Sequence, residues 1–232
     1  MLTGSPWRVA LSSAASPATP LSTAWDWMLS RKYASEPLAI RYVDFMIGQH
    51  EPAAAARGWM TYLAGTGVGY LPGESIFNGS FELTPTGNRF DWRINRVDGV
   101  SVDLDPSAQA EGKQSLRLRF DGKKNPGELG VQQTRLVAAG RYRFHASVRT
   151  AGVTTDQGLR VRIVSESAPG VNVETENLRG TMDWTPVEAV FDVPGSGALL
   201  RVSLARTTSL KFDGNIAGTA WIDNVSLTRL TP

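Results

Sequence analysis

The chain has 232 residues, of which 41% are hydrophobic and 20% charged, and its 24 basic and 22 acidic residues leave a formal net charge of +2. This composition excludes a disordered chain, and the mixed charges, without a basic stripe, predict no nucleic-acid partner. The absence of cysteine excludes a disulfide scaffold and a thiolate metal site, and no run of about 18 apolar residues predicts a membrane span.

The first residues lack the pattern of an export signal. Arg8 is followed by the short apolar run 9–11, whereas a secretory signal needs an apolar core of about 7–15 residues. We therefore expect a cytoplasmic protein, or a periplasmic or extracellular one if a signal lies upstream of this sequence.

Residues 1–74 carry helical signals after a Ser/Ala/Pro-rich stretch that we expect to form a loose arm. Helices are predicted over 20–33, 38–47 and 53–63, and glycine follows the last two, at Gly48 and Gly65. Because the links are short, the helices are expected to form an antiparallel hairpin or a three-helix segment. Their apolar stripe needs cover from the rest of the chain or from more helices of a longer parent chain.

Residues 75–232, beyond a Gly/Pro hinge at 65–75, change to a period of two. Clusters of glycine, proline and asparagine separate short segments in which apolar and polar residues alternate. Many short alternating strands with frequent turns predict a mainly β fold, an antiparallel jelly-roll β-sandwich. The predicted strands cover residues 115–120, 141–148, 159–164, 187–191, 199–204 and 219–227.

An ordered set of motifs in this second part resembles the galactose-binding-like jelly rolls. The opening resembles their N-G-S-F-E motif, and the last strand resembles their W-I-D-D-V-x-L motif. The matching segments are residues 76–82, 90–92, 111–116, 139–144, 184–194 and 221–227. Several carbohydrate-binding modules of xylanases and glucanases use this fold. A helical lead-in followed by such a domain also resembles tetratricopeptide-repeat proteins of bacterial exopolysaccharide loci.

The resemblance implies a non-catalytic carbohydrate-binding module, associated with bacterial polysaccharide assembly or secretion. A polysaccharide or oligosaccharide is then the expected partner. The alternative is a structural scaffold without a sugar ligand, whose helical segment docks a protein partner.

A structural calcium ion is also implied by the resemblance, because these modules often hold one between their first and last strands. The matching positions are Glu82 and Asp223, with backbone carbonyls at Gly112 and Lys113. Calcium prefers oxygen ligands from such carboxylates and carbonyls. In the alternative interpretation the two carboxylates cap turns or pair with arginines. No organic cofactor is expected, because residues 65–69 lack the G-K-[ST] end of a nucleotide loop.

The tryptophans at Trp92, Trp184 and Trp221 occupy positions that define the fold, so we expect them to pack rather than to stack on a sugar. Polar side chains around two predicted loops are the better ligand candidates, since arginine–carboxylate contacts suit an acidic polysaccharide. The alternative is a solvated strand face. These candidates are Arg149, Asp156, Gln157, Arg160, Arg206 and Asn215, with Arg162 and Asp213 beside them.

Enzyme chemistry is not predicted. A glycosidase needs two carboxylates across a cleft, and the number of acidic residues makes some pair inevitable without being informative. A serine–histidine pair would have to use His145, which lies inside an alternating strand. We therefore assign no catalytic residue.

Overall fold

The computed structural model describes residues 18–68, 76–166 and 170–231. Most of the expected N-terminal arm, most of the hinge and the boundary between the two parts therefore lie outside the described residues. Within them, no helix is long and apolar enough to cross a membrane. Three helices come first, α1 (Ala18–Ser30), α2 (Glu36–Gly48) and α3 (Pro52–Thr66).

The described strands form two antiparallel five-stranded sheets, so the prediction of a mainly β sandwich behind a small helical segment is confirmed. Sheet A has the order β1-β4-β9-β6-β7, and sheet B has the order β2-β3-β10-β5-β8. The strands are β1 (Arg93–Ile94), β2 (Val100–Asp105), β3 (Ser115–Asp121), β4 (Glu128–Val137), β5 (Gly140–Val153), β6 (Arg160–Ser165), β7 (Asn172–Glu174), β8 (Gly180–Val193), β9 (Ala198–Ala205) and β10 (Ala217–Arg229).

Alternation along each strand builds the core between the sheets. On β3 the side chains of Leu116, Leu118 and Phe120 are buried, while Arg117 and Arg119 point to the outer face. Each such apolar side chain contributes about 1.5–3 kcal/mol through its burial. The polar side chains between them are thereby presented to solvent on both outer faces of the sandwich.

The helix ends follow local chemistry. Proline stands in the first turn of α2 and of α3, where the missing N–H costs no helical hydrogen bond. The prediction that Gly65 ends the last helix is wrong by a short margin, because α3 continues to Thr66. The left-handed C-cap is Gly67, with φ of 78°.

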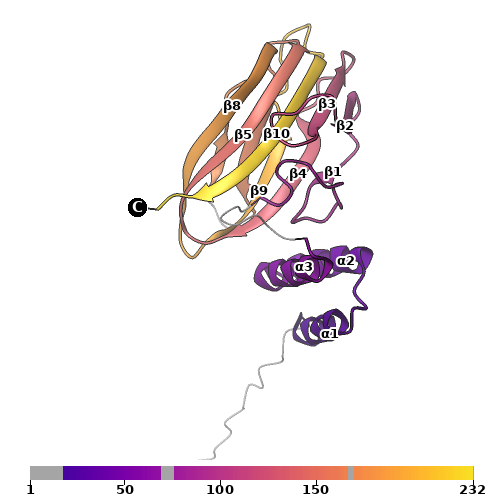
Figure 1. Ribbon diagram of the computed structural model, residues 1–232. Coiled ribbons are helices and arrows are strands. Elements are labelled where there is room, and N and C mark those ends of the chain that lie inside the picture. Colours follow the sequence, from indigo (N-terminus) through magenta and orange to yellow (C-terminus); the bar gives the residue numbers. More distant parts are fainter. Residues whose placement is uncertain (1–17, 69–75, 167–169, 232) are drawn as a thin grey trace, which may run out of the picture.

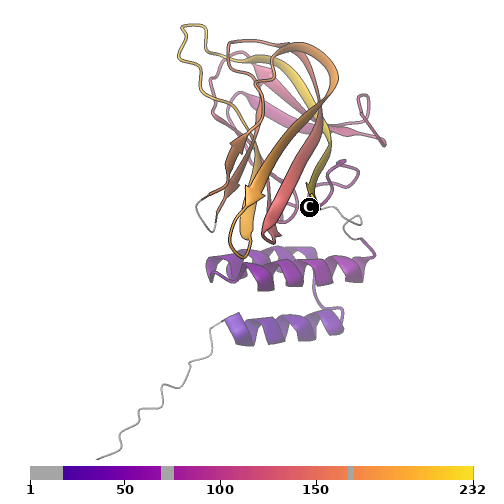
Figure 2. The same cartoon turned by 90° about the vertical axis from the view of Figure 1, so that its left-hand side faces the viewer.

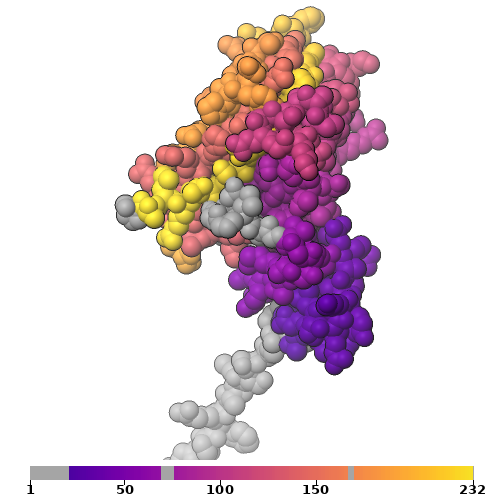
Figure 3. Space-filling view, in the orientation of Figure 1, coloured from indigo at the N-terminus to yellow at the C-terminus, as the bar shows by residue number. Residues whose placement is uncertain are grey.

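The helices pack against one end of the sandwich (Figures 1 and 2). One apolar cluster joins Trp59 of α3 to Phe77, Phe90 and Leu199, and Leu136 packs against its edge. Helix α1 lies on the far side of α2 and α3, so it does not reach the sheets (Figure 1). The space-filling view shows the helices and this end of the sandwich as one continuous body (Figure 3). The sandwich therefore covers part of the apolar stripe of the helices, while Phe45 and Met60 stay exposed.

Candidate functional site

A row of polar side chains crosses all five strands of sheet A on its outer face. The strand register pairs each member with the next, and paired residues point to the same side of a sheet. Their sequence neighbours Val131, Val202 and Ile163 lie in the core, so the row faces away from it. We call these residues the polar row: Arg93, Gln132, Ser203, Arg162 and Glu174.

Arg162 is the centre of charge in the polar row. Its Nη1 donates to Glu128 Oε1 at 2.6 Å, and its Nε donates to Glu174 Oε1 at 2.8 Å. Ser203 on the neighbouring strand is nearly buried, so the middle of the polar row has small polar side chains at its base, and the longer side chains of Arg93 and Arg162 lie on either side. A floor of hydroxyl and amide groups between guanidinium walls offers both donors and acceptors to a polar ligand.

The floor continues into a hollow. Thr134 and Arg201 are register partners on the same face, along the strands from Gln132 and Ser203. They line a cavity of 230 Å³ together with Arg89, Arg93, Gln132 and Glu166. Arg201 Nη1 lies 3.7 Å from Glu166 Oε1, and Arg89 Nη1 lies 3.8 Å from Glu166 Oε2. Both distances exceed the length of a hydrogen bond, so the two guanidiniums lie near the Glu166 carboxylate without donating a hydrogen bond to it.

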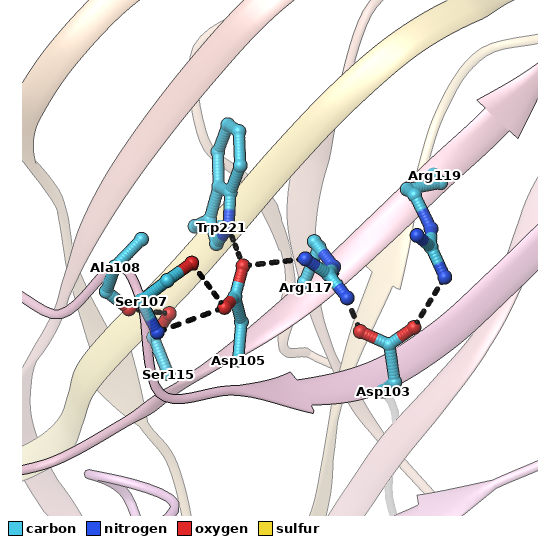
Figure 4. Close-up of polar contacts among 8 residues, drawn as sticks. All are labelled: Asp103, Asp105, Ser107, Ala108, Ser115, Arg117, Arg119 and Trp221. Atoms are coloured by element: carbon cyan, nitrogen blue, oxygen red, sulfur yellow. Dashed lines mark hydrogen bonds and ion pairs between the residues drawn. The ribbon is translucent and has the colours of Figure 1, made fainter.

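The outer face of sheet B also carries bonded charges, in a ladder where Arg117 bridges two carboxylates as Arg162 does on sheet A (Figure 4). Arg117 donates to Asp103 at 2.8 Å and to Asp105 at 2.7 Å, and Arg119 donates to Asp103 at 2.8 Å. The indole N–H of Trp221 donates to Asp105 at 2.8 Å, while the Arg149 guanidinium lies 5.4 Å from the centre of the Trp221 ring. Trp221 is thus engaged at its edge and on one face of its ring.

Asp105 anchors this ladder. Its side chain is only 4% exposed, and Ser107 donates to it through both its backbone N–H and its hydroxyl. Burial acts to raise the pKa of Asp105, but the bonds from Ser107 and Trp221 and the charge of Arg117 outweigh it and lower the pKa to about 2. The cluster therefore stabilises sheet B with its hydrogen bonds already made.

The other two tryptophans differ in exposure. Trp92 is 1% exposed and packs in the core, as expected, with its indole N–H on the Asn78 carbonyl. Trp184 is half-buried on β8.

The structure brings most of the predicted ligand residues to the loops around Arg206, and Arg149 lies apart from them on sheet B. Arg206 is 1% exposed, and its guanidinium donates to Asn125, Thr155 and the Gln157 carbonyl, which ties together three loops at the end of the sandwich away from the helices. Burial lowers the pKa of Arg206, and the charge of Asp156 opposes that shift.

Asp156 accepts a hydrogen bond from Ser209 at 2.6 Å, which lowers the pKa of the Asp156 carboxyl. These residues position loops around Arg206, and Asn215 lies exposed on the same segment as Ser209. Arg149 lies on sheet B instead, 3.9 Å from Asp183.

Arg160 is the predicted ligand residue that lies beside the polar row. It is two residues from Arg162 on β6, so both side chains leave the same face of sheet A. Its guanidinium reaches the Thr175 carbonyl at 3.3 Å and Gln157 Oε1 at 3.4 Å. Arg160 and Arg162, both singled out in the sequence, therefore lie on this face, and whether they bind a ligand stays a prediction.

The residues predicted to hold calcium do come together. Asp223 is completely buried, and its carboxylate accepts the backbone N–H groups of Ala110 and Glu111 at 2.8 and 3.1 Å. Glu82 accepts the N–H of Lys113 at 2.8 Å. Burial raises the pKa of Asp223, the backbone hydrogen bonds oppose this, and the charge of Glu82 adds to the rise.

Two carboxylates from the first and last parts of the sandwich thus meet at one loop, and their oxygens are donors that calcium accepts. Both also cap the loop by accepting its amides, as the alternative interpretation expected. Among the described residues no group of three or more His, Asp or Glu side chains forms a metal cluster, so backbone carbonyls would have to complete a calcium shell. Calcium stays a prediction.

Sequence reasoning missed Arg93, Gln132, Ser203 and Arg201. The alternation in 199–204 marks Arg201 and Ser203 as outward-facing, which is a usable signal. Nothing local connects them with Arg93 or Gln132, because only the pairing of β1, β4 and β9 brings these side chains to one face.

No family model and no curated protein matches the sequence. Similar folds occur among solved structures. The CBM22-1 xylan-binding domain of Xyn10C from Paenibacillus barcinonensis is 15% identical, with a TM-score of 0.45 over 66% of this chain and 93% of that domain. The C-terminal family 22 carbohydrate binding module of Clostridium thermocellum Xyn10B is 13% identical, with a TM-score of 0.43 over 68% and 95%.

The enzymatically active domain of bacteriophage CBA120 tailspike protein 4 is 14% identical, with a TM-score of 0.46 over 70% of this chain and 22% of that one. At these identities the likeness concerns the fold alone.

Proposed function

We propose that this chain binds a saccharide on the outer face of sheet A without transforming it. The observation that carries the proposal is the polar row, which spans all five strands and opens into a hollow lined by three arginines. Sugar hydroxyls donate and accept hydrogen bonds at once. The guanidiniums, the amide of Gln132 and the carboxylate of Glu174 match them along one line.

The setting we propose, bacterial polysaccharide assembly or secretion, rests on the resemblance of the helical lead-in and the sandwich to exopolysaccharide-locus proteins. A structural calcium ion at Glu82, Asp223 and the carbonyls near Lys113 belongs to the same proposal. It would neutralise two carboxylates that repel one another, and it would fasten the opening segment of the sandwich to its last strand.

The alternative, a scaffold that binds a protein, is favoured by one observation on the helices. An apolar hollow of 440 Å³ lies between α1 and α2, and the exposed Phe45 forms part of its lining. Apolar hollows of this kind occur in surfaces that receive a partner's side chains. Under this alternative, the polar row carries no ligand.

Isothermal titration calorimetry against neutral and acidic oligosaccharides tests the proposal with two matched variants. Arg162→Ala removes the centre of the polar row, and Arg119→Ala removes an exposed arginine from the outer face of sheet B. We expect Arg162→Ala to weaken binding by about tenfold, because a charge-assisted hydrogen bond is lost. Arg119→Ala should stay within about twofold. Equal loss in the two variants, or no binding of any saccharide, would contradict the proposal and favour the scaffold.

A further inference from the structure

The polar face of sheet A is closed at one end. Along β4 and β9, the paired residues change from Gln132 and Ser203, through Thr134 and Arg201, to Leu136 and Leu199. Leu199 belongs to the apolar cluster of the helices, and Leu136 packs against it. The helices therefore sit on the last register pair of the same face that carries the polar row.

Helix α2 also contacts this end of sheet A through an ion pair. Asp44 of α2 accepts hydrogen bonds from Arg93 at 2.6 and 2.7 Å and from Arg89 at 3.2 Å. Arg93 is the first member of the polar row, so the helix contacts the row directly. A saccharide chain lying on the polar row would meet α2 at the Arg93 end of the row and could not continue past it.

Positive charge exceeds negative charge where the face closes. Three guanidiniums, those of Arg89, Arg93 and Arg201, meet the two carboxylates of Asp44 and Glu166. Asp44 takes its hydrogen bonds from Arg89 and Arg93, while the Arg201 side chain is 42% exposed and lies beyond hydrogen-bond distance of Glu166. The Arg201 guanidinium can therefore turn towards a carboxylate on a ligand. A guanidinium binds a carboxylate with two parallel hydrogen bonds.

The size of the hollow sets how much of a ligand it holds. At 230 Å³ it is smaller than the pockets that take drug-sized ligands, which begin at about 300 Å³. Such a hollow suits a single sugar residue, and the open part of the polar row would hold the residues that follow it.

We infer that the closed end of sheet A receives the terminal residue of an acidic saccharide chain and that Arg201 binds the carboxylate of that residue. This inference rests on the proposed function. It adds that binding occurs at chain ends and that the end residue is a uronic acid.

The experiment uses the full chain and three homopolymers, of galacturonate, glucuronate and mannuronate. Each is presented intact, after partial cleavage to short oligomers, and after chemical reduction of its carboxylates to neutral sugars. Neutral xylan and glucan oligomers are included as probes of the proposed function alone. Calorimetry gives affinity and stoichiometry for the parent chain, for Arg201→Ala and for Arg162→Ala, and thermal unfolding verifies that both variants are folded.

At least one uronate oligomer is expected to bind, with a capacity that rises in proportion to the number of chain ends. Arg201→Ala should weaken that binding by at least about tenfold and leave the reduced oligomer within about twofold, because only the carboxylate contact is lost. Arg162→Ala should weaken both oligomers. This pattern supports the inference.

Other outcomes overturn it in distinguishable ways. Capacity that does not change on cleavage refutes binding at ends. Equal affinity for an oligomer and its reduced form, or an Arg201→Ala variant that loses both equally, refutes the carboxylate contact and leaves the proposed function standing. Binding of neutral oligomers alone refutes the acidic end residue, and failure of every saccharide refutes the proposed function together with the inference.

Discussion

Asp105→Asn tests the assignment of the charged ladder on sheet B to stability. The Asp105 carboxylate accepts hydrogen bonds from Ser107, Trp221 and Arg117, and its side chain is 4% exposed. An amide in its place would turn an NH2 group towards one of these donors and would remove the charge that pairs with Arg117. We expect the free energy of unfolding at pH 7 to fall by about 2–3 kcal/mol.

The pH dependence follows from the pKa of Asp105, which is about 2 in the folded chain and 3.8 in its ordinary state. A carboxyl with a lowered folded pKa stabilises the fold above pH 3.8, and this stabilisation is lost as the pH falls towards 2. The shift corresponds to about 2 kcal/mol, of which about half is lost by pH 3. The difference between parent and Asp105→Asn should therefore shrink as the pH falls.

Urea unfolding at pH 7, 5 and 3 measures this double difference, in which the titration of other carboxyls cancels. Asp183→Asn serves as the control on the same sheet, because its side chain is 91% exposed, and it should alter the free energy of unfolding by at most about 0.5 kcal/mol. A difference between parent and Asp105→Asn that is the same at pH 7 and pH 3 would refute the assignment of the stabilising charge to Asp105.

Three further predictions concern the loops. Arg206→Met should lower the free energy of unfolding by about 3 kcal/mol or more, because it leaves buried acceptors in three loops without their donor. Urea titration measures this loss, and a change under about 1 kcal/mol would contradict the role of Arg206. Gly112→Ala should lower the melting temperature more than Gly87→Ala does. Both glycines have positive φ, but only at Gly112 would a Cβ lie 2.2 Å from Glu82 Oε1. Equal decreases in melting temperature would show that this contact relaxes freely. The melting temperature should be higher with calcium than with EDTA, and Glu82→Gln and Asp223→Asn should each reduce this difference. An equal melting temperature of the parent chain in calcium and in EDTA would reject the calcium site.

Local patterns predicted β3, β5, β6, β8, β9 and β10 in whole or in part, and they missed β1, β2, β4 and β7. The alternation at 115–120 predicts β3 closely, since each apolar residue there faces the core. Strand β4 breaks the rule because Gly130, with φ of 79°, accompanies an irregular register, and because Gln133 is buried where it exchanges hydrogen bonds with the Phe77 backbone. A polar residue that faces inward cannot be recognised from periodicity, so the sequence offers no signal for this strand.

The candidate site could not be predicted for a related reason. Arg162 was visible as half of an alternating pair with Arg160, yet its partners on the face come from strands far away in sequence. Ser203 is 41 residues from Arg162, and the two meet only because β6 pairs with β9 in one register. A shift of that register by one residue would turn Ser203 into the core. Motif matching located the carboxylates of Glu82 and Asp223 because each stands inside a recognisable local segment.

The helical segment and the sandwich depend on each other at the face where we propose that ligand binds. The helices need Leu199 and Phe77 to cover their apolar stripe, and sheet A needs the helices because Leu136 and Leu199 would otherwise form an apolar patch beside the polar row. The same contact that stabilises the helices therefore decides where the polar face ends. A displacement of α2 would break the Asp44–Arg93 pair and open the face at that end, so packing of the helices and the length of saccharide that can be accommodated are linked.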